Sequence, residues 1–186
     1  MRYGCYFSCE IISLASANMK GGERMEIYLM QHGPSLPKEQ DPDEGLSPEG
    51  EKRIHASGKA LKKMGIKFDA ILASTKKRSL QTAEIIAEEV GFSPERIIET
   101  ERVKAMSPPE EAINALAEMS GYTKVLIAGH LPSLAGVASF LLTEGSTATV
   151  AFERGGCCRI DVEELPTHSG RLRWYVTPEQ LNLIAS

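Results

Sequence analysis

The sequence lacks three features that would point to particular classes of protein. It has no basic surplus, because 21 Lys and Arg residues stand against 25 Asp and Glu residues and the net charge is −4, so we expect no nucleic-acid partner. No apolar run is long enough to cross a membrane, so we expect no membrane partner. The four cysteines show neither zinc-ligand nor CxxC spacing. We therefore expect reduced thiols and a cytoplasmic location.

The chain also lacks internal repeats and low-complexity tracts, and its 186 residues suffice for one domain with a sizeable core. We expect that domain over residues 25–186, preceded by a poorly ordered extension over residues 1–24. The extension superficially resembles a secretory signal, but Glu10 and several serines and cysteines weaken its apolar run. We favour an extension upstream of a functional start at Met25, separated from the domain by Gly21-Gly22.

Strands and helices alternate along the domain. Apolar, β-prone runs at residues 25–30, 68–73 and 124–128 predict buried strands, each followed by a helical pattern. The expected helices cover residues 47–65, 77–90, 108–120 and 132–142, a short strand includes residues 97–98, and more antiparallel strands cover residues 147–152, 156–162 and 171–176. This alternation predicts an α/β fold, a three-layer sandwich with a mostly parallel central sheet.

Polar residues follow each of the three most strand-like runs. The first run ends in Gln31-His32-Gly33, the second is followed by Ser74 to Arg78, and the third ends in Gly129-His130. The carboxyl ends of parallel strands meet at one edge of a sheet, so we expect these groups in one crevice. Two histidines, an arginine and one or two lysines would form a cationic pocket suited to a phosphoryl group. A helix beginning near Lys77 would add its first amide groups.

Each of these residues, taken alone, also has a purely structural interpretation. His55, on a polar helix face, and His168, in a turn, are expected to be hydrogen-bonded scaffold residues. Lys76 and Lys77 would ordinarily be solvated charges, as would Arg78. The joint arrangement after three strands is what favours an anion site.

The segments at these strand ends resemble three motifs of the histidine phosphatase (phosphoglycerate mutase-like) superfamily, in particular of SixA-type phosphohistidine phosphatases. A strand followed by Arg-His-Gly corresponds to residues 29–33, Leu-Met-Gln-His-Gly. The second motif, Ser followed after a few residues by Arg-x-x-Gln-Thr-Ala, corresponds to residues 74–83. Gly-His-x-Pro corresponds to residues 129–132. The resemblance covers Met25 to about Leu183.

The resemblance implies a metal-independent phosphatase of phosphoglycerate mutase-like fold that needs no cofactor. In that family His32 would be the nucleophile and form a covalent phosphohistidine, while His130 and Arg78 would hold the phosphoryl oxygens. The residues expected to contact the phosphoryl group beside them are Gln31, Gly33, Lys76 and Ser74. The substrate would be a phosphorylated protein, most directly one carrying phosphohistidine, or a small phosphorylated molecule.

The chain departs from the family pattern at two positions. Gln31 replaces an arginine, whose charged contact is typically worth about 1.5–3 kcal/mol, and Lys76 is expected to restore part of that charge. Glu44 stands where SixA-type proteins often have a further arginine. The candidate general acid is Glu101, with Glu99 as the alternative; either could equally be a surface charge.

Three interpretations stay open at this point. The stretch between residues 91 and 124 has no room for the helical lid insertion of larger family members, which implies an open site suited to a protein-borne phosphoryl group and argues against a mutase. A small-molecule phosphomonoesterase of the same family is the first alternative. The second is a non-catalytic module that binds phosphohistidine without hydrolysing it, because Gln31 and Glu44 alter the charge of the site.

Overall fold

The computed structural model describes residues 24–119, 121–145 and 148–186. All of the predicted extension over residues 1–24 except Arg24 therefore lies outside the described residues. In the described part, six strands form one sheet in the order β3-β2-β4-β1-β5-β6. The strands are β1 (Met25–Gln31), β2 (Ala70–Ser74), β3 (Ile98–Thr100), β4 (Lys124–Gly129), β5 (Cys157–Val162) and β6 (Arg171–Val176).

The sheet is mostly parallel, as predicted. The four strands from β3 to β1 run parallel to one another, whereas β5 pairs antiparallel with β1 and with β6. The helices between and after the strands are α1 (Pro48–Lys63), α2 (Lys77–Val90), α3 (Pro109–Ala117), α4 (Ser133–Leu142) and α5 (Pro178–Ala185), with short 3₁₀ turns η1 (Pro94–Arg96) and η2 (Glu101–Val103). None of these helices combines the length and apolar character needed to cross a membrane, within the part of the chain described.

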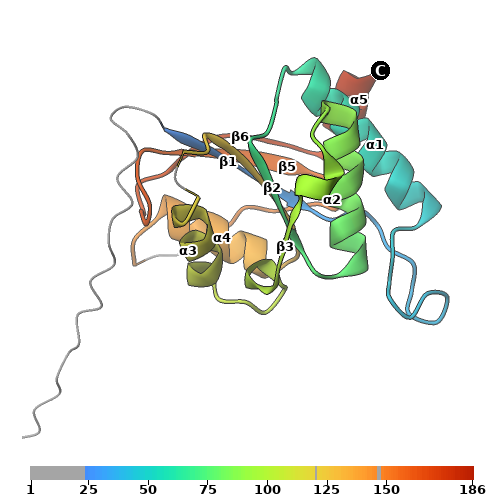
Figure 1. Ribbon diagram of the computed structural model, residues 1–186, viewed down its shortest axis with the longest axis horizontal. Coiled ribbons are helices and arrows are strands. Elements are labelled where there is room, and N and C mark those ends of the chain that lie inside the picture. Colours follow the sequence, from blue (N-terminus) through green and yellow to red (C-terminus); the bar gives the residue numbers. More distant parts are fainter. Residues whose placement is uncertain (1–23, 120, 146–147) are drawn as a thin grey trace, which may run out of the picture.

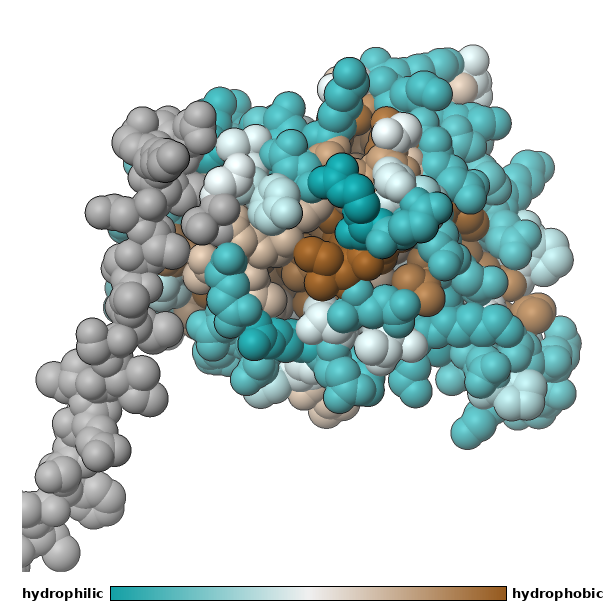
Figure 2. Space-filling view, viewed as in Figure 1, coloured by the Kyte–Doolittle hydropathy of each residue, from teal (hydrophilic) through white to brown (hydrophobic). Residues whose placement is uncertain are grey.

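Helices cover the two faces of the sheet, with α1, α2 and α5 on one side and α3 and α4 on the other (Figure 1). The alternating side chains of β1 explain why both faces are covered. Met25, Ile27 and Leu29 pack into the core beneath α3 and α4, whereas Tyr28 and Met30 pack into the core beneath α1 and α2. A parallel strand buried on both faces reads as a continuous apolar run, which is how β1 appears in the sequence. In the same view, Figure 2 shows a mainly hydrophilic surface with a small hydrophobic area near its middle.

The helix boundaries near the site follow local sequence signals. Ser47 caps α1 by accepting a hydrogen bond from the Gly50 amide at 3.0 Å, and Pro48 occupies the first helical position, as predicted. The next helix, α2, begins at Lys77 directly after β2 and a short turn. It ends at Gly91, whose φ of 77° is the left-handed conformation that glycine adopts without strain.

Some expectations of secondary structure are wrong. Residues 148–152 form no strand, because no neighbouring strand is paired with them in the described residues, although Phe152 is buried in the core. The helix expected over residues 108–120 ends at Ala117. The sequence patterns also gave no indication of α5, a helix of 8 residues whose start is fixed by a capping box between Thr177 and Gln180.

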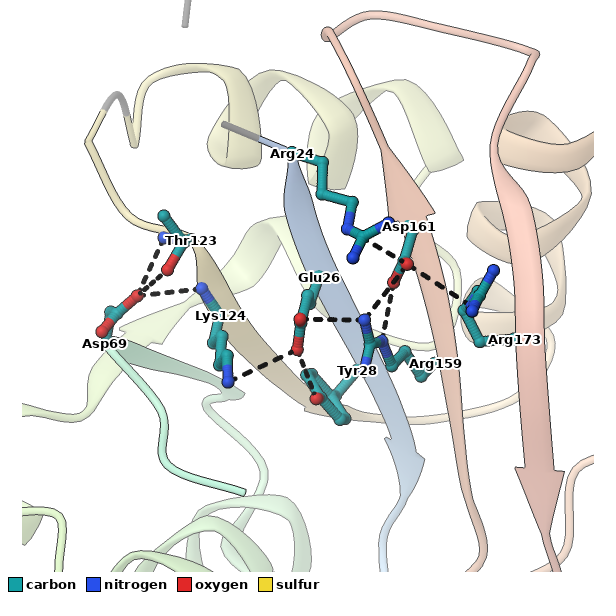
Figure 3. A network of polar contacts seen from close by, with 9 residues as sticks. All are labelled: Arg24, Glu26, Tyr28, Asp69, Thr123, Lys124, Arg159, Asp161 and Arg173. Carbon is teal, nitrogen blue, oxygen red and sulfur yellow. Dashed lines mark hydrogen bonds and ion pairs between the residues drawn. The ribbon is translucent and has the colours of Figure 1, made fainter. Parts of the chain in front are cut away.

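A network of charged side chains joins β1 and β5 at the amino end of β1 (Figure 3). Asp161 is buried and accepts hydrogen bonds from Arg159 at 2.6 and 3.1 Å. Arg24 and Arg173 each lie 3.6 Å from the same carboxylate, and Glu26 pairs with Arg159 at 2.8 Å. This network lies at the end of β1 opposite to His32, so it supports the fold rather than the predicted site.

Candidate active site

His32 directly follows the carboxyl end of β1 and is buried. Its Nδ1 lies 2.7 Å from the carbonyl oxygen of Gly33. A carbonyl oxygen can only accept a hydrogen bond, so Nδ1 carries the ring proton and Nε2 keeps its lone pair. The Nε–H group of Arg78 donates to that Nε2 atom at 3.2 Å. The nucleophilic nitrogen of this imidazole is therefore the one beside the arginine.

The surroundings of His32 keep its imidazole neutral. Burial is the main cause that lowers the pKa of His32 to about 4. The hydrogen bond to the Gly33 carbonyl opposes it, and the positive charges of Arg78 and Arg154 lower the pKa further. At neutral pH the ring is thus unprotonated, which is the state required of a nucleophile.

His130 follows the carboxyl end of β4, and its ring centroid lies 4.9 Å from that of His32. Burial first, and then the charges of His32, Arg78 and Lys76, lower its pKa to about 3. Its Nε2 is 3.0 Å from the hydroxyl of Ser74, whereas its Nδ1 is buried without a hydrogen-bond partner among the described residues. Ser74 is fully buried at the end of β2, so the structure places its hydroxyl against His130.

Arg78 lies in the first turn of α2 and reaches towards His32. Besides the hydrogen bond from its Nε, its Nη1 lies 3.3 Å from a carboxylate oxygen of Glu44, without forming a hydrogen bond to it. The first turn of α2 contains no acidic residue, so no carboxylate of this turn neutralises the partial positive charge at the amino end of the helix. Lys76, at the N-cap position, is exposed and adds positive charge near His130.

Gln31 and Gly33 precede and follow His32 in the chain, and both are tightly packed. The Oε1 atom of Gln31 is buried and has no hydrogen-bond partner in the described residues. The amide of Gly33 donates to the Thr82 hydroxyl at 3.2 Å, and this hydroxyl donates to the Arg78 carbonyl at 2.7 Å. A Cβ at Gly33 would lie 2.8 Å from Ile54, so only glycine fits this position without displacement of a neighbour.

A tight loop before α1 holds Glu44 against the site. Glu44 has a φ of 53°, a left-handed conformation that is strained for a residue other than glycine. The side chain of Asp41 anchors the loop by accepting hydrogen bonds from the Gly45 amide and from Lys77, both at 2.9 Å. The carboxylate of Glu44 is thereby kept beside Arg78.

The structure does not bring the candidate general acid Glu101 into contact with the histidines. Its carboxylate is exposed and forms an ion pair with Lys104. This ion pair lowers the pKa of Glu101, which favours the ionised form and disfavours proton donation at neutral pH. Glu99, the alternative, is an exposed residue of the edge strand β3.

The other two histidines lie in structural contacts, as expected. His55 is 2.8 Å from the Glu89 carboxylate, and His168 is 2.7 Å from the Phe140 carbonyl. A groove of about 730 Å³, lined partly by His55 and residues of α1 and α5, includes none of the predicted site residues. Among the described residues, no three His, Cys, Asp or Glu side chains are grouped so that they could hold a metal ion.

Sequence reasoning missed two residues near His32. Thr82 links the backbones of Gly33 and Arg78, and its place in the Gln-Thr-Ala part of the second motif was the available signal. Arg154 lies in the loop before β5, close enough for its charge to lower the pKa of His32. No pattern in the sequence connects Arg154 with the three strand ends, because the loop reaches the site only through the antiparallel pairing of β5 with β1.

The strand ends bring an unprotonated histidine, a second histidine and an arginine together. Comparisons with known proteins then indicate the family of the chain. The family model of the histidine phosphatase superfamily (branch 1) matches residues 27–107. The serine/threonine-protein phosphatase Pgam5, mitochondrial, of Drosophila yakuba is 32% identical over 138 residues, which cover 73% of this chain and 42% of that protein. An uncharacterized protein of Picosynechococcus sp. is 30% identical over 119 residues, which cover 59% of this chain and 68% of that protein.

Solved structures share the fold. The protein histidine phosphatase SixA, complexed with tungstate, superposes with a TM-score of 0.73 at 20% identity, covering 84% of this chain and 99% of that one. A phosphoglycerate mutase from Bacillus anthracis gives a TM-score of 0.68 at 12% identity, covering 91% of this chain and 99% of that one. The chain belongs to the histidine phosphatase superfamily. It spans less than half of the Drosophila yakuba Pgam5 protein.

Proposed function

We propose that the protein is a phosphatase that removes the phosphoryl group from protein phosphohistidine through a covalent intermediate on His32. One observation carries this proposal. The unprotonated Nε2 of His32 lies beside Arg78, and two buried nitrogen atoms of the neighbouring side chains have no hydrogen-bond partner in the described residues: Arg78 Nη1 and His130 Nδ1. Buried polar groups are normally paired, so unpaired ones clustered around a nucleophile indicate a ligand that completes them.

The proposed reaction has two displacements at phosphorus. The lone pair of His32 Nε2 attacks in line and forms a P–N bond to His32. The P–N bond to the substrate histidine breaks at the same time; that ring carries a proton on its other nitrogen, so its electrons return to a ring that leaves as neutral imidazole. Water then attacks phosphorus, the bond to His32 breaks, and inorganic phosphate leaves. Arg78 would release His32 and donate its N–H groups to the oxygens of the transferring group.

His130 is proposed to donate from Nδ1. The amide of Lys76 donates to the hydroxyl oxygen of Ser74 at 3.4 Å, so the hydroxyl proton is available for His130 Nε2. His130 would then carry its own proton on Nδ1, the buried atom without a partner. In this mechanism Ser74 is a positioning residue that selects the tautomer of His130, and a neutral imidazole donates the hydrogen bond.

Two features support phosphohistidine over a phosphoester. A departing imidazole needs less help from an acid than an alkoxide does, because its conjugate acid has a pKa of about 6.5. Of the two glutamates considered as general acids, Glu101 is held ionised by its pair with Lys104, and Glu99 is an exposed residue of the edge strand β3. The stretch from α2 to β4 contains one short strand, two 3₁₀ turns and the 9-residue α3, which leaves the site without a long helical cover in the described residues.

The relationship to Pgam5 favours a second candidate, a phosphatase of phosphoserine or phosphothreonine in proteins. The serine/threonine-protein phosphatase activity is stated in the name of the Pgam5 relatives. This chain covers 42% of the Drosophila yakuba protein, at 32% identity. The two candidates share the nucleophile and the anion site and differ in the leaving group. They predict different substrate preferences for the same His32 chemistry.

A substrate panel tests the proposal. Purified protein is given a phosphohistidine-containing carrier protein, a phosphoserine or phosphothreonine peptide and p-nitrophenyl phosphate, and phosphate release is measured for wild type and His32→Ala. We expect the highest kcat/KM with phosphohistidine and no release by His32→Ala. A higher kcat/KM with the phosphoserine or phosphothreonine peptide would support the second candidate instead. Retained activity in His32→Ala would reject the covalent mechanism for both.

A further inference from the structure

The residue before His32, Gln31, carries no charge, whereas a neighbouring loop carries an arginine. Gln31 occupies the position before the nucleophile, and a glutamine carries no charge. Its backbone carbonyl accepts a hydrogen bond from the Gly155 amide at 2.9 Å. This bond ties the end of β1 to the loop over residues 153–156, which carries Arg154.

Hydrogen bonds to neighbouring elements hold the loop over residues 153–156 in place. The hydroxyl of Ser57 on α1 donates to the Gly155 carbonyl at 2.9 Å, and the Glu153 amide donates to the hydroxyl of Tyr175 at 2.7 Å. A further backbone bond from Gly156 to Glu153 closes the turn at 2.8 Å. Contacts from α1, β1 and β6 thus fix the backbone on both sides of Arg154, so that its side chain starts from a defined place beside the site.

The side chain of Arg154 is free to bind a ligand. Its residue is exposed, and no ion pair or side-chain hydrogen bond holds its guanidinium among the described residues. By contrast, Arg53, which donates to the Arg154 carbonyl at 3.5 Å, is itself paired with Glu49. The charge of Arg154 also acts on His32, whose pKa it helps to lower.

We propose that Arg154 binds a non-bridging oxygen of the transferring phosphoryl group and supplies the cationic contact that Gln31 cannot make. This inference rests on the proposed function, because it assigns a further binding residue to the same site. A guanidinium suits the task, since its planar donors match two phosphoryl oxygens at once. The site would then hold the phosphoryl group between arginines from two separate elements, α2 and the loop before β5.

The test measures anion binding and turnover separately. Tungstate, a tetrahedral dianion, is titrated by calorimetry into wild type, Arg154→Gln and Arg154→Lys, and kcat/KM is measured with the phosphohistidine carrier protein. We expect Arg154→Gln to weaken tungstate binding and lower kcat/KM by about tenfold each, which corresponds to about 1.4 kcal/mol. Arg154→Lys should recover part of both, because a lysine keeps the charge without the bidentate geometry.

Two further variants make the test specific. Gln31→Arg in the Arg154→Gln background should restore most of the tungstate affinity, because it returns a positive charge next to His32. Arg171→Ala is the matched control: Arg171 is an exposed arginine at the start of β6, at the opposite end of the sheet, and its loss should change binding less than twofold.

The outcomes separate the two proposals. Tungstate affinity and kcat/KM of Arg154→Gln within twofold of wild type, together with an active wild type, would overturn the role of Arg154 and leave the proposed function standing. A wild type that turns over no phosphorylated substrate, but loses tungstate affinity on Arg154→Gln, would reject the function and support the anion contact. A wild type that neither binds tungstate nor turns over any phosphorylated substrate would overturn both.

Discussion

The protonation of His32 gives a prediction with a definite magnitude. The pKa of about 4 follows from burial and from the nearby arginines. At pH 5 such a histidine is about 9% protonated, whereas one with the ordinary pKa of 6.5 would be about 97% protonated. The fraction able to act as a nucleophile therefore differs by about 30-fold between the two cases at that pH.

Nuclear magnetic resonance of protein labelled with ¹⁵N and ¹³C in histidine measures this directly between pH 3.5 and 8. The signals of His32 are assigned by their absence in His32→Gln, and the same protein unfolded in concentrated urea provides the reference titration. We expect the folded midpoint below pH 5 and the Nδ1–H tautomer throughout the neutral range. A folded midpoint between pH 6 and 7 would refute the reasoning from burial and charge.

The same pKa values set a direction for stability. The folded-state pKa values of His32 and His130 lie near 4 and 3, below the ordinary value of 6.5 for an unfolded chain, so the unfolded state binds more protons between these limits. The contribution of these two residues is fully present above pH 6.5 and is lost as the pH falls through their folded pKa values.

Three substitutions probe the charges and the packing around the site and the core. Glu44→Gln removes the carboxylate that competes for Arg78, so tungstate should bind about two- to fivefold more tightly by calorimetry; weaker binding would contradict the competition. Asp161→Asn removes a buried charge from the network of Figure 3 and should lower the free energy of unfolding in urea by about 3 kcal/mol. The control Glu163→Gln, at an exposed position, should lower it by less than about 0.5 kcal/mol. Equal losses in the two variants would contradict a role of burial. Gly50→Ala would place a Cβ 2.0 Å from the carbonyl oxygen of Pro34, so thermal unfolding should show that the free energy of unfolding falls by at least about 1–3 kcal/mol. An unchanged midpoint would show that the segment after His32 moves without cost.

The central strands and the two histidines were predictable because their signals are local. The runs that became β1, β2 and β4 are continuous and apolar, which is typical of parallel strands covered on both faces. The rule that parallel carboxyl ends share an edge then places His32 and His130 together, and the structure has their ring centroids 4.9 Å apart.

Other parts depend on contacts that a sequence does not display. The expected strand over residues 147–152 has suitable residues but no partner strand in the described part, so its apolar pattern was misleading. Arg154 lies in a loop whose position depends on hydrogen bonds to β1, α1 and β6. Pairing of Glu101 with Lys104 is likewise a choice between rotamers, which residue spacing does not determine.

The central claim is that His32 carries the phosphoryl group during turnover. The protein is mixed for a few seconds with a ³²P-labelled phosphohistidine carrier protein, quenched in base, which preserves phosphohistidine, and separated from the carrier. Label should appear on the wild-type chain, map to the peptide containing His32 and be lost when unlabelled substrate is added before the quench. Its absence from wild type during measurable phosphate release, or its presence on His32→Ala, would contradict the proposed mechanism.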